Sequence, residues 1–328
     1  MKSKLLNVEE LVVTFKTDQG VFKAVDSVSF SVNKGEILGM VGESGCGKSV
    51  TAMSILRLIP LPSGAIENGK IIFKEKNLLD LDINKMRKIR GNAISMIFQE
   101  PGAALSPLHR IGHQMVEALL LHKKTDKKNA WRLAEKWLTK AGIPDAKEKI
   151  FAYPYQLSGG MQQRVMIAMA LITEPELIIA DEPTTALDVT IQLQIFELLR
   201  EMRRSDTSIL LITHDMGVIW EMCDRVLVMY ASKIVEEGSA EDVFSSPAHP
   251  YTRGLLKSIP KLQVDSKRLQ AISGQVPSPF DYPKGCNFYD RCPHAFDRCK
   301  NEVPKQHVLE NNHKAACFIA EKLISTNL

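Results

Sequence analysis

A phosphate-loop pattern, G-x-x-x-x-G-K-[ST], occurs once in this chain and constrains its fold more than any other feature. It reads GESGCGKS at residues 42–49. The run GEILGMV (35–41) before it predicts a buried strand, and VTAMSILRLI (50–59) after it predicts a helix. A glycine loop at a helix N-terminus wraps the backbone around phosphates and directs N–H groups at them. The sequence therefore predicts an α/β nucleotide-binding fold.

The loop supplies the first set of candidate site residues. We expect Lys48 to reach the β- and γ-phosphates of the nucleotide and Ser49 to bind Mg²⁺. Cys46 is interpreted as a small filler without assigned chemistry. The predicted nucleotide-binding residues of this segment are Gly42, Ser44, Gly45, Gly47, Lys48, Ser49 and Thr51.

Polar residues also follow three other strand-like runs. LIIADEP (177–183) predicts a buried strand that ends in Asp181 and Glu182. Ligands of doubly wound sheets lie at the carboxyl ends of strands. Asp181 would hold Mg²⁺, which prefers oxygen ligands, and Glu182 would polarise an attacking water. His214 follows SILLIT and Gln99 follows AISMIF, so both are candidates at the same edge.

Six motifs in order resemble the nucleotide-binding subunit of an ABC transporter across roughly residues 5–240. They are GESGCGKS, IFQEP, LSGGMQQR (157–164), LIIADEP, TTALD (184–188) and ITHD (212–215). The resemblance implies a P-loop NTPase ABC nucleotide-binding domain with a RecA-like core, an antiparallel β subdomain and a helical signature subdomain. It also implies an ATPase that uses Mg²⁺.

The resemblance places LSGGMQQR against the γ-phosphate of a nucleotide held by a partner subunit. Its contacting residues would be Ser158, Gly159 and Gly160. LSGGMQQR lies about 110 positions after the phosphate loop, too far along the chain to serve the same nucleotide in one subunit. We therefore expect two ATP sites that form only when two such chains close on each other.

The same resemblance implies the catalytic roles. Glu182 and His214 would orient the attacking water, and Gln99 would contact both Mg²⁺ and that water. Asp188 would lie at the dimer seam. An aromatic ring near the N-terminus would stack on adenine, either Phe15, which we favour, or Phe22.

The domain organisation follows from periodicity. Residues 5–35 alternate apolar and polar residues, which predicts an antiparallel β-portion beside the adenine. Helical patterns at 111–122 and 129–142, the latter ending at a glycine, predict an inserted helical subdomain over about 105–165. We assign residues 1–240 to the ABC ATPase domain and 241–328 to a small, loop-rich C-terminal extension.

The extension resembles that of ATPases from the oligopeptide, dipeptide and nickel importer family. The resemblance rests on SSPAHPYTRGLLKSIP (245–260) and a cysteine-rich stretch at 276–299. It implies ATP-driven import of dipeptides or oligopeptides. The alternatives are nickel or another small solute, a non-transport ABC ATPase acting on DNA or ribosomes, or a regulatory subunit that binds nucleotide without turnover.

The implied partners are two transmembrane permease subunits, a second ATPase subunit that is a related chain or a second copy, and indirectly a solute-binding protein. A net charge of +4 without a basic face or reader motif gives no reason to expect nucleic-acid binding. No run approaches the ~18 apolar residues of a membrane span, and no signal peptide is visible. We expect a peripheral protein at the cytoplasmic face of the membrane.

Four cysteines of the extension predict a metal site, because cytosolic proteins rarely keep disulfides. They are Cys286, Cys292, Cys299 and Cys317, spaced C-x5-C-x6-C-x17-C. Structural zinc sites usually contain a short C-x2–4-C pair, which is absent here. We therefore favour a [4Fe–4S] cluster over Zn²⁺ or no metal, with His294 and His313 as substitute ligands. Its role would be to order a tail that builds little core of its own.

Overall fold

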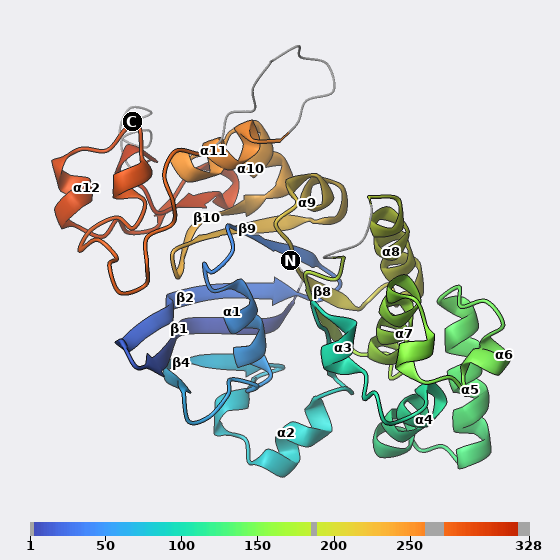
Figure 1. Cartoon of the computed structure of the whole chain (residues 1–328). Helices are drawn as coiled ribbons and strands as arrows, with labels where there is room; N and C mark the ends of the chain where they lie inside the picture. The colour runs from blue at the N-terminus through green and yellow to red at the C-terminus, as the bar shows by residue number, and fades with distance from the viewer. Residues whose placement is uncertain (1–2, 185–188, 260–271, 321–328) are drawn as a thin grey trace. The chain divides into compact units, whose positions relative to one another are not determined.

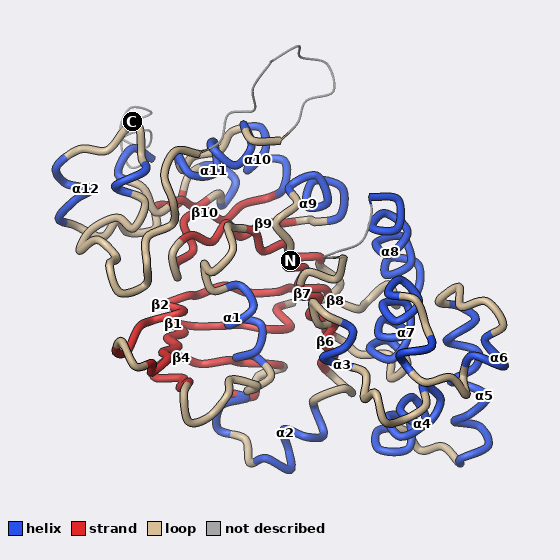
Figure 2. Tube along the Cα trace, in the orientation of Figure 1, coloured by secondary structure: helices blue, strands red, loops and turns tan. Residues whose placement is uncertain are grey.

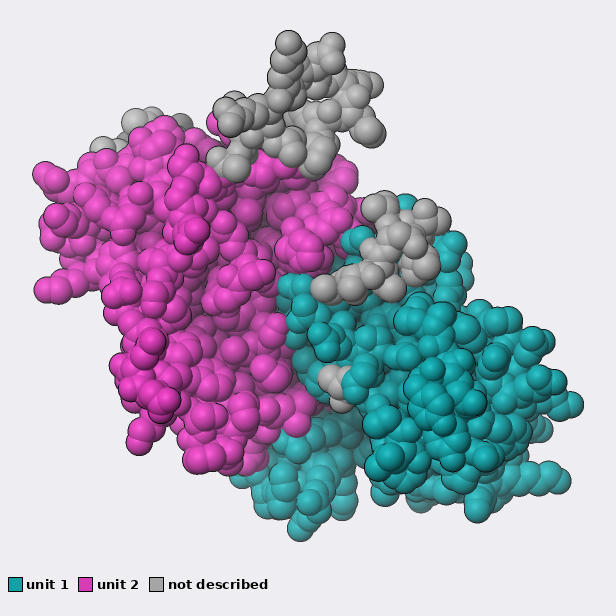
Figure 3. Space-filling view, in the orientation of Figure 1, with its two compact units in different colours: residues 1–5, 33–36, 80–212 teal, residues 6–32, 37–79, 213–328 magenta. Residues whose placement is uncertain are grey.

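The computed structural model describes residues 3–184, 189–259 and 272–320 (Figure 1). The chain divides into two compact units (Figure 3). Unit 1 comprises residues 1–5, 33–36 and 80–212, and unit 2 comprises residues 6–32, 37–79 and 213–328.

Unit 1 contains three parallel strands in the order β8-β7-β6. They are β6 (Ile94–Ile97), β7 (Leu177–Asp181) and β8 (Ser208–Ile212). Every residue of β7 and β8 is buried. Continuous apolar runs are typical of parallel strands covered on both faces, so the predicted strands are confirmed.

The helices of unit 1 include the predicted helical segments. They are α2 (Ile83–Ile89), α3 (Pro101–Ala104), α4 (Ile111–His122), α5 (Lys127–Lys140), α6 (Ala146–Lys149), α7 (Gly159–Leu171) and α8 (Val189–Met202). Helix α4 has the predicted bounds, and α5 begins two residues earlier than predicted. Asp126 caps α5 by accepting from the Asn129 N–H at 2.9 Å. Gly142 just past its end has φ 69°, the left-handed conformation that glycine adopts there.

Unit 2 contains the predicted antiparallel β-portion, with the strand order β2-β1-β4-β5. The strands are β1 (Lys4–Thr17), β2 (Gly20–Asn33), β4 (Gly64–Phe73) and β5 (Lys76–Asn77), of which residues 6–32 and 64–77 belong to this unit. Strand β1 pairs antiparallel with β4, for example Val13 with Ile66. A short 3-10 turn, η1 (Leu78–Asp80), follows β5.

A second group of strands in unit 2 runs in the order β11-β12-β10-β9-β3. They are β3 (Ile37–Val41), β9 (Arg225–Tyr230), β10 (Lys233–Ser239), β11 (His307–Val308) and β12 (Lys314–Ala315). Strand β3 is parallel to β9, and the other pairs are antiparallel. The helices are α1 (Lys48–Ile55), α9 (Met216–Met222), α10 (Ala240–Ser245), α11 (Pro250–Lys257) and α12 (Asp297–Asn301).

The tail is mostly loop, as predicted (Figure 2), and it packs against strands that precede it. Its strand β12 pairs with β10, with Ala315 opposite Glu236. The rings of Tyr230, Tyr251 and Phe288 are buried together, with centroids 4.6–5.4 Å apart. Buried aromatic side chains contribute a large apolar area per residue to the stability of a core. Because Tyr230 and Glu236 belong to β9 and β10, the tail shares this core with strands that precede it, and the expectation that it builds little core of its own stays a prediction. No helix within the described residues is long and apolar enough to cross a membrane.

Candidate nucleotide-binding and catalytic site

Two glycines of the phosphate loop sit where a side chain cannot. Gly42 has φ 154°, and a Cβ atom there would lie 2.0 Å from the Met229 carbonyl oxygen. Gly47 has φ 106°, and its Cβ would lie 2.3 Å from the Ala24 carbonyl oxygen. Both positions require glycine, because L side chains avoid these backbone angles and rigid backbone atoms occupy the space.

Lys48 is buried at the start of α1 and points back into the loop. Its ammonium donates to the carbonyl oxygens of Gly42 at 2.8 Å and Glu43 at 3.1 Å. Ser49 is half-buried beside it. Thr51 is fully buried and donates its hydroxyl to the Gly47 carbonyl at 2.9 Å. Thr51 therefore supports the loop in this structure, and its predicted contact with nucleotide stays a prediction.

The tip of the loop faces solvent. Ser44 and Gly45 are exposed, and a Cβ at Gly45 would have nothing within 4 Å. Cys46 is buried, and burial raises the pKa of its thiol above the ordinary value. The exposed tip leads into the N-terminus of α1, and backbone N–H groups at a helix N-terminus are suited to phosphate.

The two candidate adenine platforms lie together in unit 2. The rings of Phe15 and Phe22 are stacked with centroids 6.0 Å apart. Phe280 of the tail packs edge-on against Phe22 at 5.3 Å. This third ring was not predicted from the sequence.

In unit 1 the structure brings Gln99 and Glu182 together. The Gln99 side-chain amide donates to the Glu182 carboxylate at 3.4 Å. Glu182 has φ 44°, and its N–H donates to the Ile212 carbonyl at 2.9 Å. A left-handed conformation costs a non-glycine residue about 1–2 kcal/mol, and such strain gathers at functional sites. Asp181, the last residue of β7, is buried.

The predicted signature residues lie at the N-terminus of α7. Ser158 caps this 13-residue helix by accepting from the Met161 N–H at 3.4 Å. Ser158 and Gly159 are exposed, while Gly160 is half-buried. Gln163 on the same helix donates to the Pro183 carbonyl, directly after Glu182. An exposed helix N-terminus with small residues is a ready anion site.

His214 is exposed and lies in unit 2, immediately before α9. Its neighbour Asp215 caps α9 by accepting from the Gly217 N–H at 2.7 Å. Asp188 lies outside the described residues.

The four tail cysteines are free thiols that line one small cavity of about 10 Å³. Its walls include Cys286, Cys292, Cys299, Cys317, His249 and His294. Burial, with a smaller contribution from the other thiols, raises the pKa of Cys286 to about 12. Burial is also the main reason why the pKa values of Cys292 and Cys317 are raised.

Within residues 3–184, 189–259 and 272–320, no group of three or more His, Cys, Asp or Glu side chains is arranged to hold a metal ion. This finding gives no support to a single Zn²⁺ ion or to a [4Fe–4S] cluster on the four cysteines. His313 is not a substitute ligand either, because its Nε2 pairs with Glu236 at 2.7 Å. The [4Fe–4S] cluster stays a prediction.

Two family models match the chain. The model described as ABC transporter matches residues 25–185. The model described as oligopeptide/dipeptide transporter, C-terminal region, matches residues 235–299.

Curated relatives align over nearly the whole chain. A dipeptide transport ATP-binding protein, DppD, of Bacillus subtilis is 49% identical over 97% of this chain and 96% of its own length. The oligopeptide transport ATP-binding protein OppD of Escherichia coli is 44% identical over 98% of this chain and 95% of its own length.

Solved structures agree with the family models. A dimeric structure of a bacterial ABC transporter cassette matches with a TM-score of 0.64 and 27% identity, covering 72% of this chain and 98% of that chain. A dimeric ATP-binding cassette in a post-hydrolysis state bound to ADP and Pi matches with the same TM-score and 26% identity, over the same shares of both chains. The chain belongs to the ABC transporter family, as an ABC ATPase with the C-terminal region of the oligopeptide/dipeptide transporters.

Proposed function

We propose that this chain hydrolyses ATP to energise the import of dipeptides or oligopeptides through a membrane permease. The relatives named for dipeptide and oligopeptide transport align over at least 95% of their own length, and the C-terminal match at 235–299 supports the same solute class. The observation that supports the ATPase mechanism is that the tip of the phosphate loop and the N-terminus of α7 are both exposed. Each would contribute one side of an ATP site between two chains. Ser44 and Gly45 at the loop tip and Ser158 and Gly159 at α7 are all exposed.

In the proposed mechanism, two chains enclose two ATP molecules, each between one phosphate loop and the opposite LSGGM segment. Lys48 leaves the Gly42 and Glu43 carbonyls for the β- and γ-phosphates. Glu182 accepts a proton from the attacking water, and Gln99 and His214 orient that water. Since ATP would contact both subunits only in the closed dimer, its binding shifts the population toward closure.

The donor set suits Mg²⁺, a hard cation that prefers oxygen ligands. Ser49 would supply a hydroxyl and Asp181 a carboxylate, with Gln99 as a further oxygen ligand. When bound, the ion neutralises charge on the transferred phosphoryl group. Asp181 is only 5% exposed, so a cation would compensate its negative charge in the buried strand end.

A direct test of the catalytic assignment is Glu182→Gln. The neutral amide keeps the shape of the carboxylate but accepts no proton, so ATP binds and closed dimers accumulate. Size-exclusion chromatography with ATP and Mg²⁺ measures the dimer, with Glu148→Gln on α6 as a control. Normal turnover by the Glu182→Gln protein would show that the assignment of Glu182 is wrong.

The partners proposed are two permease subunits, a second ATPase subunit and, indirectly, a solute-binding protein, with the chain at the cytoplasmic face of the membrane. We favour a related chain over a second copy as the ATPase partner. The solute is tested in reconstituted transporter, by comparing ATPase stimulation by solute-binding protein loaded with dipeptide, longer peptide or nickel. Stimulation by nickel alone would replace the peptide assignment. Stimulation by DNA or RNA would instead favour a non-transport ATPase.

We further propose a [4Fe–4S] cluster held by Cys286, Cys292, Cys299 and Cys317. The proposal is supported by the four thiols, which line one small cavity, and by the absence of a short C-x2–4-C pair typical of zinc sites. Its chemistry would be structural, joining four separate points of the tail. Iron and acid-labile sulfide are measured on anaerobically purified protein, with about four of each expected per chain. Cys292→Ser should lower both, whereas Cys223→Ser, at a buried thiol outside this cavity, should not. Protein without iron and sulfide would refute the cluster.

A further inference from the structure

The second residue of the phosphate loop, Glu43, is held by the tail. The guanidinium of Arg291 donates to the Glu43 carboxylate through both terminal nitrogens, Nη1 to Oε2 at 2.6 Å and Nη2 to Oε1 at 3.0 Å. The Arg291 side chain is only 4% exposed, whereas that of Glu43 is 30% exposed. A bidentate pair of this kind fixes orientation as well as distance. The pair raises the pKa of Arg291, mainly through the Glu43 hydrogen bond.

The tail also holds the backbone of Glu43. The Glu43 N–H donates to the hydroxyl of Tyr251, which is fully buried in α11, at 2.9 Å. Arg291 itself is fixed on its far side, because its guanidinium lies over the rings of Tyr230 and Phe288 at 5.7 and 6.0 Å from their centroids. Side chain and main chain of Glu43 are thus both anchored by residues outside the cassette.

The same tail loop reaches the phosphate loop by a second route. Asn287 donates to the Ala231 carbonyl at 2.7 Å. The next residue, Ser232, donates its N–H to the Cys46 carbonyl at 3.0 Å. Asn287 follows Cys286 and Arg291 precedes Cys292, so the contacts with both ends of the loop come from one segment bounded by two cysteines.

Glu43 is also a partner of the lysine that the reaction needs. Its carbonyl accepts from Lys48 at 3.1 Å and from the Cys46 N–H at 3.3 Å. Moving the Glu43 peptide therefore moves the turn that aims Lys48 and the loop amides. We propose that Arg291 is a positioning residue for the phosphate loop, so that the tail segment 286–292 sets the affinity of this chain for ATP.

The effect of charge can be separated from the effect of position. The two explanations predict opposite changes in the affinity for nucleotide when the Glu43 charge is removed. If Arg291 acted only as a nearby positive charge, removing it would weaken ATP binding. Removing the Glu43 charge would then strengthen binding, and the double variant would resemble the native protein. If the pair positions the loop, Glu43→Gln, Arg291→Gln and the double variant all bind nucleotide more weakly, and the double is no worse than the single.

The experiment measures binding of the Mg²⁺ complex of a non-hydrolysable ATP analogue to the full chain by calorimetry. We expect an increase of about tenfold in Kd for each variant, in line with the loss of a charge-assisted contact. Arg291→Lys keeps the charge but not the planar guanidinium that makes the bidentate contact. Its Kd should lie between those of the native protein and Arg291→Gln. The control is Arg298→Gln, at an exposed arginine that pairs with Glu302 inside the tail and should bind normally.

Thermal unfolding of each variant shows which proteins are folded. Should Arg291→Gln fail to fold, the decision rests on Glu43→Gln, whose side chain is partly exposed. Unchanged or tighter binding by folded Glu43→Gln overturns the proposal, as does native affinity in the double variant.

Discussion

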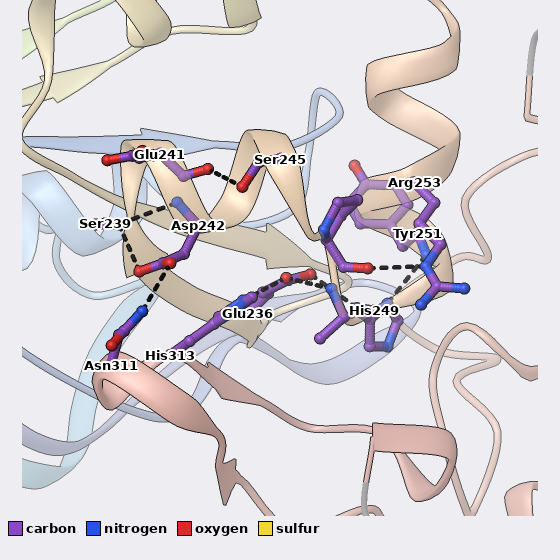
Figure 4. A network of polar contacts seen from close by, with 12 residues as sticks. Glu236, Ser239, Glu241, Asp242, Ser245, His249, Tyr251, Arg253, Asn311 and His313 are labelled. Atoms are coloured by element: carbon purple, nitrogen blue, oxygen red, sulfur yellow. Dashed lines mark hydrogen bonds and ion pairs between the residues drawn. The ribbon is translucent and has the colours of Figure 1, made fainter. Parts of the chain in front are cut away.

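Nε2 of His313 lies 2.7 Å from the Glu236 carboxylate, and both side chains are buried (Figure 4). The two oxygens of Glu236 also accept from the backbone N–H groups of Ala248 at 2.7 Å and His249 at 2.9 Å. One buried carboxylate on β10 therefore joins three separate parts of the chain. Such groups stabilise a fold only while every partner is in place.

Removing His313 should destabilise the protein strongly. His313→Ala leaves the Glu236 carboxylate, which is fully buried, with backbone donors alone. We expect a loss of about 3 kcal/mol in the free energy of unfolding, measured by urea denaturation. Asn311→Ala removes an exposed 3.3 Å contact with Asp242 and the asparagine that suits a φ of 55°, and it should cost about 1 kcal/mol or less. Equal stability of the two variants would contradict this account of the pair.

His249 should make stability depend on pH. Its Nδ1 accepts from the Tyr251 N–H at 3.1 Å, and burial lowers its pKa to about 4 from the ordinary 6.5. Below pH 6.5 the unfolded chain binds a proton that the folded chain does not, so stability falls between pH 6.5 and 4. The contribution is about 2 kcal/mol between pH 7.5 and 5.

The variant that tests this is His249→Asn, whose amide oxygen can still cap α11. Urea midpoints at pH 7.5 and 5 should differ less in this variant than in the native protein. An unchanged pH slope would mean that another group carries the effect.

Lys48→Ala should abolish ATP turnover. The ammonium is the only cation of the phosphate loop, and loss of a charge that stabilises the transition state costs about a hundredfold or more in rate. Phosphate release by the assembled transporter measures the effect. Lys85→Ala, at an exposed lysine paired with Asp82, serves as the matched control and should retain native turnover.

Two glycines of the loop should respond differently to alanine. Gly47→Ala places a Cβ 2.3 Å from a backbone oxygen, whereas the Cβ of Gly45→Ala meets nothing within 4 Å. Gly45→Ala should cost about 1 kcal/mol, because its φ of 80° still strains an L residue. Gly47→Ala should cost at least about 3 kcal/mol. Equal melting temperatures for the two variants would show that the loop relaxes around Gly47.

The sequence predicts well what depends on local pattern. Apolar runs that end in a polar residue correctly predicted β6, β7 and β8. Because the carboxyl ends of parallel strands meet at one edge of a sheet, the same runs also placed Gln99 near Glu182. Boundaries were less accurate. The helix predicted over 50–59 is α1 over 48–55, because Arg57 adopts φ 52° and the chain turns toward Pro60.

The contacts of the tail could not be predicted in this way. Glu43 occupies a variable position of the phosphate-loop pattern, and no periodicity links it to Arg291. The burial of Tyr251 depends on rings that come from β9 and from the cysteine segment, far apart in the sequence. The cysteine spacing predicted convergence of four thiols, but it does not encode the distances among them.

The Glu43–Arg291 pair also orders events during synthesis. The two residues are 248 positions apart, so at about 5–20 residues per second a ribosome adds Arg291 about 12–50 s after Glu43. Throughout that interval the growing chain contains the complete GESGCGKS sequence but not the Arg291 side chain that pairs with Glu43. Anchoring of the ATP-binding loop therefore has to wait until Arg291 has been synthesised, and a chain truncated before Arg291 has the motif but lacks its anchor.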